Sequence, residues 1–104
     1  MPGINFAKLR QEISMRQVLH LLHFAPTHRT GDQWYGHCPL HESDAARRRT
    51  FSVNVRINCY YCHKCKSHGD QFSLWANASN KTLYTATIDL CTQLSIAVPW
   101  VNHG

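Results

Sequence analysis

A chain of 104 residues is long enough for one small domain, because a core of this size does not divide into two stable parts. It carries eleven Lys and Arg residues against six Asp and Glu residues, a formal charge of +5, which favours an anionic partner over a cationic one. The N-terminus shows no basic segment followed by an apolar one, and no apolar run approaches the roughly 20 residues of a membrane span. We therefore expect a cytoplasmic protein with no membrane segment.

The first element that the sequence predicts is a helix over about residues 15–23. Ser14 and Gln17 have the spacing of a capping box, in which each side chain bonds the backbone amide of the other residue. Apolar residues follow at helical spacing until Pro26, which cannot continue a helix. The apolar residues before Ser14 recur irregularly, so no element is predicted there.

The middle of the chain predicts an antiparallel sheet. A turn signal at Gly31-Asp32 predicts a hairpin that leads into residues 34–36. Apolar and polar residues alternate over 50–56, as in a strand that is buried on one face, and 58–62 is the expected partner strand. In that partner strand Tyr60 lies on the face opposite to its neighbour in sequence, Tyr61.

Two more helices are predicted after the sheet. Asp70 can cap a helix over about residues 70–77, and Thr82 can cap another over about residues 83–94. Helices thus flank the predicted sheet on both sides along the chain.

Two pairs of soft metal ligands face one another across twenty positions of the sequence. Cys38 and His41 form the first pair, and Cys62 and Cys65 form the second. A tetrahedral zinc ion needs four N or S ligands, and a short turn with two ligands supplies half of them. The four residues predict one closed Cys3His site for a structural Zn2+ ion, because no position is left for a reactive water. Iron in a rubredoxin-like role is the alternative metal.

Other residues compete for these ligand positions. Cys59 precedes Cys62 with the same spacing, and periodicity alone does not choose between them, although a strand directs the side chain of Cys59 away from that of Cys62. Cys91 is predicted to be a small buried hydrophobe. Three histidines are further candidates whose simpler interpretation is a solvated loop residue: His37, His63 and His68. In a reducing cytoplasm, such cysteine pairs indicate metal or redox chemistry rather than structural disulfides.

Three segments together resemble a known family, the CHC2 zinc-binding domain found at the N-terminus of bacterial DnaG-type primases. They are YGHCPLH at 35–41, TFSV at 50–53 and YYCHKCKSHGD at 60–70. The resemblance covers nearly the whole chain, and it implies the same four ligands, with Cys59 at a strand position that does not bind the metal. It implies an α+β fold with a single domain over 1–104: a small zinc ribbon at about 27–70, whose short antiparallel β-sheet is flanked by one N-terminal and two C-terminal helices.

The sequence also departs from a complete primase. Such an enzyme continues into a Toprim domain whose carboxylates hold magnesium, whereas this chain stops at Gly104 and its six acidic residues are scattered singly. The run Arg47–Arg49 replaces the more mixed loop expected at that place. The sequence leaves enzymatic activity undecided and favours a non-catalytic module.

The function that the resemblance implies is binding of single-stranded or template DNA during replication or primer synthesis, within a primosome. Between Arg29 and Lys66 there are seven basic residues and three acidic ones, so the predicted metal-bearing part is cationic. The candidate phosphate contacts are Arg47, Arg48, Arg49, Arg56, Lys64 and Lys66, and the candidate surfaces for base stacking are Tyr60 and either Trp34 or Tyr35. The simpler interpretation is a solvated loop of arginines and a set of core aromatics.

The alternative function is a protein-interaction adaptor. A compact zinc module could dock on a primase catalytic subunit, a helicase or a transposase in a replication, plasmid, phage or transposon complex. A small redox or nuclease enzyme has less support, because its cysteine pairs would have to be free of metal.

Overall fold

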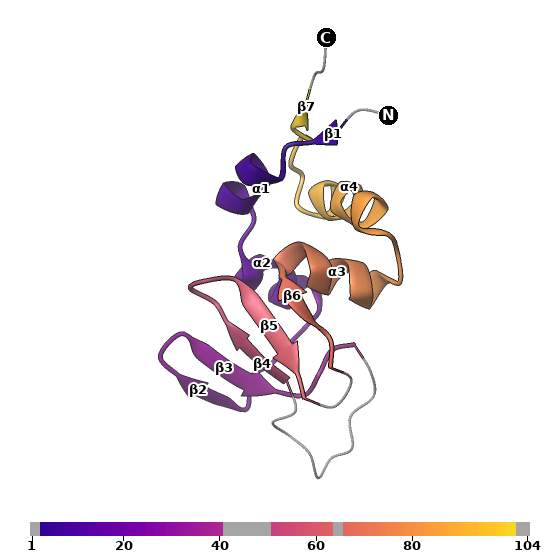
Figure 1. Cartoon of the computed structure of the whole chain (residues 1–104). Coiled ribbons are helices and arrows are strands. Elements are labelled where there is room, and N and C mark those ends of the chain that lie inside the picture. Colours follow the sequence, from indigo (N-terminus) through magenta and orange to yellow (C-terminus); the bar gives the residue numbers. More distant parts are fainter. Residues whose placement is uncertain (1–2, 41–50, 64–65, 102–104) are drawn as a thin grey trace.

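The computed structural model describes residues 3–40, 51–63 and 66–101 of the chain. In this part of the chain, four helices accompany a five-stranded and a two-stranded antiparallel sheet, so the fold is α+β as predicted (Figure 1). In chain order the elements are β1 (Gly3–Ile4), α1 (Phe6–Glu12), α2 (Met15–Leu21), β2 (His28–Thr30), β3 (Gln33–Gly36), β4 (Phe51–Asn54), β5 (Cys59–Cys62), β6 (His68–Asp70), α3 (Gln71–Ser79), α4 (Leu83–Gln93) and β7 (Trp100–Val101). None of the described helices combines the length and the apolar character needed to cross a membrane.

The five-stranded sheet has the order β2-β3-β4-β5-β6, and each strand is antiparallel to its neighbours. Successive side chains of a strand point to opposite faces, so the register assigns each residue to a face. Phe51 and Val53 of β4 are fully buried and define the inner face, which faces the helices. Ser52, between them, lies on the outer face, as the alternation in the sequence predicted.

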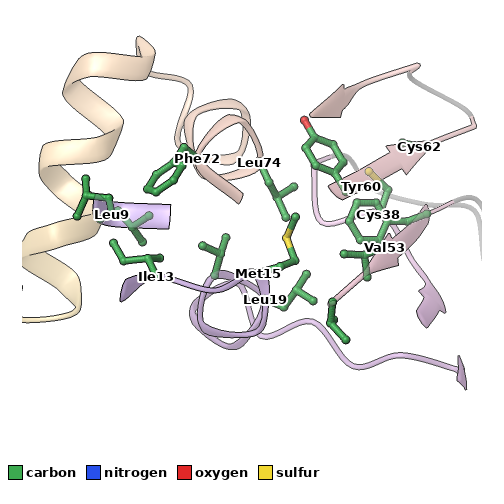
Figure 2. Close-up of a cluster of buried hydrophobic side chains, with 14 of the residues drawn as sticks. Leu9, Ile13, Met15, Leu19, Cys38, Val53, Tyr60, Cys62, Phe72 and Leu74 are labelled. Carbon is green, nitrogen blue, oxygen red and sulfur yellow. The ribbon is translucent and has the colours of Figure 1, made fainter. Parts of the chain in front are cut away.

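The core fills the space between the inner face and the helices. Figure 2 shows Met15 and Leu19 of α2 and Leu74 of α3 directed toward Val53 and Tyr60 of the sheet. The same apolar cluster continues away from the sheet into α1 and α4, through Leu9, Ile13, Phe72, Leu90 and Cys91. One continuous cluster therefore joins the sheet to all four of the described helices.

The helix caps predicted from sequence are confirmed. At the start of α2 the Gln17 amide donates to Ser14 Oγ at 3.3 Å, and the Ser14 amide donates to Gln17 Oε1 at 2.6 Å. Asp70 caps α3 and Thr82 caps α4. Helix α2 ends two residues earlier than predicted, because His23 takes a left-handed backbone conformation with φ of 57°.

Four elements were missed. Helix α1 is capped by Asn5, and Phe6, Leu9 and Ile13 follow at the helical spacing i, i+3 and i+7, a local signal that was overlooked. Strand β6 has three residues and contains a glycine, and β1 pairs with β7 over two residues each. Leu83, the first residue of α4, is 46% exposed.

Gly69 in β6 is a position that only glycine fits. Its φ is +147°, and a Cβ there would lie 2.7 Å from Ser73 Cβ. We expect Gly69→Ala to lower the free energy of unfolding by about 2–5 kcal/mol, from backbone strain together with overpacking. Urea denaturation of the zinc-loaded protein would measure it. The matched control is Gly31→Ala, where φ is +60° and no atom lies within 4 Å, with an expected cost of about 1–2 kcal/mol. Equal losses in the two variants would contradict the close-packing explanation.

Candidate metal centre and nucleic-acid interface

The segment after β3, which carries Cys38, and the segment that begins at Cys62, the last residue of β5, leave the sheet at the same end. We call them the two cysteine turns. Strands β3 and β5 run in the same direction because each is antiparallel to β4 between them. The register pairs Gly36 with Phe51 and Phe51 with Cys62, so the last residues of β3 and β5 flank the first residue of β4. Cys38 follows β3 by two residues. The fold thus brings the first halves of both predicted ligand pairs to one end of the sheet.

Cys38 and Cys62 have the surroundings of soft metal ligands. They are 3% and 0% exposed and belong to the apolar cluster, as Figure 2 shows. The Leu40 amide donates to Cys38 Sγ at 3.4 Å, a bond that favours the thiolate over the thiol. A buried thiolate needs a compensating positive charge, which a divalent cation supplies. Cys38 and Cys62 therefore fit as two of the soft ligands of a zinc ion.

Backbone hydrogen bonds close the turn between β5 and β6. The Cys62 amide donates to Ser67 O, and the Lys66 amide donates to Cys62 O, each at 2.9 Å. Lys66 has a positive φ of 62°. Tyr60 braces this turn from the core, because its hydroxyl contacts Ser67 Oγ at 2.8 Å and accepts from Asn77 Nδ2 at 2.8 Å. These hydrogen bonds hold the turn that begins at Cys62 in place relative to α3.

The second residue of each predicted pair, His41 and Cys65, lies outside the described residues. Within residues 3–40, 51–63 and 66–101, no group of three or more His, Cys, Asp or Glu side chains gathers that could hold a metal. The structure thus places Cys38 and Cys62, and the full set of four ligands stays a prediction.

The other cysteines have different surroundings. Cys59 is exposed and lies on the outer face of the sheet, where it pairs with Asn54 and Asp70 in the register. Cys91 is fully buried, and this burial, followed by the charge of Glu12, raises the pKa of its thiol. A raised pKa disfavours the thiolate that a metal or an electrophile requires, in agreement with a structural role for Cys91.

The outer face of the sheet carries a row of ring side chains. In the register Tyr35 pairs with Ser52, Ser52 with Tyr61, and Tyr61 with His68. The Tyr61 ring meets the His63 ring edge-on at 4.8 Å and stacks on the His68 ring at 6.1 Å between centroids. We call Tyr35, Tyr61, His63 and His68 the aromatic face; each is at least partly exposed, and the described helices pack on the opposite face.

The predicted nucleic-acid contacts have mixed outcomes. Tyr60 as an exposed stacking surface is wrong, because it is 3% exposed and lies on the inner face. Trp34 is half-buried, with guanidinium groups over its ring. Arg56 is exposed at the end of the sheet away from the cysteine turns, and its Nε lies 3.7 Å from Asp32 Oδ2. Lys66 is exposed beside the cysteine turns. Four predicted contacts lie outside the described residues: Arg47, Arg48, Arg49 and Lys64.

Sequence reasoning missed Tyr61, although the signal was present. Tyr60 and Cys62 share a strand face by alternation, and a ligand of a closed structural site belongs on the buried side. Tyr61 must then point to the outer face. Applying this constraint to the sequence would have selected Tyr61 in place of Tyr60.

An antiparallel sheet that presents two short cysteine turns at one end is the architecture of a zinc ribbon. The chain belongs to the CHC2 zinc finger family, whose model matches residues 3–103. Membership of this family implies zinc binding.

Individual relatives agree with this family. The chain is 29% identical over 91 residues to a DNA primase of Rickettsia felis, covering 88% of this chain and 14% of that protein. It is 25% identical over 77 residues to a DNA primase of Buchnera aphidicola, covering 74% of this chain and 13% of that protein. The chain thus spans a small part of the length of these primases.

A solved structure supports the fold. The crystal structure of the zinc-binding and RNA polymerase domains of the Aquifex aeolicus primase matches with a TM-score of 0.69 at 19% identity, over 89% of this chain and 22% of that chain. At this identity the likeness establishes the fold alone. The chain and that primase share the α+β arrangement of helices and antiparallel sheet.

Proposed function

We propose that this chain is a zinc-stabilised module that binds single-stranded DNA in a primase-related process of replication or primer synthesis. The observation that carries the proposal is the aromatic face. Rings on the solvent side of a rigid sheet offer stacking surfaces to successive bases, and stacking tolerates any sequence because every base has a π-face. The family and the primase relatives support the same assignment.

In this proposal one Zn2+ ion is held by Cys38, His41, Cys62 and Cys65, and its role is structural. When bound, the ion joins the two turns at the end of β3 and β5. The inner-face residues Phe51 and Val53 pack the sheet on the helices, which leaves the outer face accessible. We propose a primase catalytic subunit or a helicase as the partner.

Binding of fluorescently labelled single-stranded oligonucleotides to the zinc-loaded protein tests the proposal. The net charge of +5 predicts that affinity falls steeply as salt rises, since each phosphate contact releases counterions. Fluorescence polarisation at about 50 and 200 mM salt would measure the fall. Absence of binding at the lower salt, or affinity that does not depend on salt, would exclude the proposal.

A second candidate function, the protein-interaction adaptor, is favoured by an apolar surface far from the aromatic face. Trp100 of β7 and Leu83 of α4 are each 46% exposed, and the ring of Tyr84 lies 6.1 Å from that of Trp100. Co-purification of one stoichiometric partner, together with no intrinsic DNA binding, would select the adaptor. Binding of oligonucleotides by the isolated protein would select the DNA-binding module.

A further inference from the structure

The guanidinium groups of two arginines lie over the ring of one tryptophan near the edge of the sheet. The guanidinium carbon of Arg29 lies 4.3 Å from the centroid of the Trp34 ring, and that of Arg16 lies 5.3 Å from it. Arg29 comes from the edge strand β2, where it pairs with Trp34 in the register, and Arg16 comes from α2. Two positively charged groups, from a helix and from an edge strand, thus lie beside one ring, and each gains a cation–π contact with it.

Neither guanidinium has a carboxylate partner in the described part of the chain. The ion pairs found there join Arg10 to Asp70, Arg56 to Asp32 and Lys81 to Asp89. Arg16 and Arg29 are both exposed. A guanidinium that stacks through its flat face keeps its N–H donors at the edge, in a fork that matches two oxygens of a phosphate.

We propose that Arg16 and Arg29, ordered by Trp34, form a phosphate clamp for the backbone of a nucleic-acid strand. Position in the sheet favours a nucleic acid over an acidic protein. Neighbouring residues of β2 point to opposite faces, so His28 lies on the outer face in register with Tyr35, while Arg29 lies on the inner side with Trp34. A strand that crosses the aromatic face therefore reaches the clamp by passing around the edge strand β2.

The clamp rests on the proposed function for its ligand, but it acts on phosphates, whereas the aromatic face acts on bases. An abasic oligodeoxynucleotide separates the two, because it keeps the phosphates and lacks the rings that stack. The zinc-loaded protein should bind this probe at low salt. The variant Arg16→Ala/Arg29→Ala should lose that binding, and Tyr35→Ala/Tyr61→Ala should retain it.

Salt dependence gives the clamp a second, quantitative readout. Each phosphate contact on a single strand contributes about 0.7 to the steepness with which log K falls against log salt. On an ordinary oligonucleotide, the double arginine variant should therefore reduce this steepness by about 1.4. Lys8→Ala/Lys81→Ala removes the same charge elsewhere and should leave the slope nearly unchanged. Arg16→Lys/Arg29→Lys keeps the charge and should preserve the slope while lowering affinity, because lysine lacks the planar fork.

Failure of the clamp and failure of the proposed function look different. An unchanged slope in Arg16→Ala/Arg29→Ala, with normal binding by the wild-type protein, overturns the clamp alone. Normal oligonucleotide binding by Tyr35→Ala/Tyr61→Ala overturns the aromatic face alone. If a glutamate peptide of equal charge displaces the abasic probe as well as unlabelled probe does, the clamp binds an acidic protein and the nucleic-acid assignment is wrong.

Discussion

Replacing Cys62 by serine should abolish cooperative folding of this chain, and not merely its binding of DNA. Cys62 ends β5, is 0% exposed, and is a proposed zinc ligand. Binding free energy at a structural zinc site is folding free energy, of order 10 kcal/mol, and this is comparable with the whole stability of a small domain. Elemental analysis of the purified protein and thermal unfolding followed by circular dichroism would measure both consequences. We expect zinc content near zero and no sigmoidal transition.

Burial of Cys62 demands a control, because a serine hydroxyl in the core is destabilising even without a metal. Cys91 on α4 supplies one, since it is equally buried and is not a proposed ligand. Cys91→Ser should cost about 1–3 kcal/mol and leave about one equivalent of zinc bound. A zinc-free Cys62→Ser protein that still unfolded cooperatively would refute the structural role of the site.

Cys59 provides the test of the ligand assignment itself. It is exposed on the outer face, so Cys59→Ser should change stability by no more than about 0.5 kcal/mol and should leave the zinc content intact. Loss of zinc in this variant would transfer a ligand position from the proposed set to Cys59.

Local chemistry explains what could be predicted of the fold. The capping box of Ser14 and Gln17, the cap at Asp70 and the cap at Thr82 act within one helical turn, so their sequence spacing carries the information. Strict alternation over β4 likewise identified the inner face, because a half-buried strand imposes a period of two residues. The joint position of Cys38 and Cys62 also depends on the pairing of β3 with β4, which the sequence pattern did not predict.

Tertiary context explains the rest. Strand β6 has three residues and exists because β5 offers it an edge, so it has no local signal of its own. The guanidinium of Arg16 in α2 lies over the ring of Trp34 in β3, and no sequence pattern predicts this contact. Contacts of this kind depend on how the helices pack on the sheet, and no local sequence pattern determines that packing.

The double variant Tyr35→Ala/Tyr61→Ala should weaken binding of ordinary single-stranded DNA about 30-fold or more. Each stacked base contributes about 1–3 kcal/mol, and 1.4 kcal/mol corresponds to a factor of ten in the dissociation constant. Both residues lie on the outer face and neither belongs to the apolar cluster, so the zinc content and the unfolding transition should change little. Fluorescence polarisation at one fixed salt concentration would measure the loss.

Tyr60→Phe is the matched control, because it alters the neighbouring tyrosine on the opposite face of β5. It removes the hydroxyl that contacts Ser67 and Asn77, so it should lower the free energy of unfolding by about 1 kcal/mol and leave the dissociation constant unchanged. The two variants thus separate the two faces of the sheet. Tyr35→Ala/Tyr61→Ala should lose affinity and keep stability, whereas Tyr60→Phe should lose stability and keep affinity. If Tyr60→Phe weakened binding while Tyr35→Ala/Tyr61→Ala did not, DNA would not lie on the outer face, and the aromatic face would have to be abandoned as its binding surface.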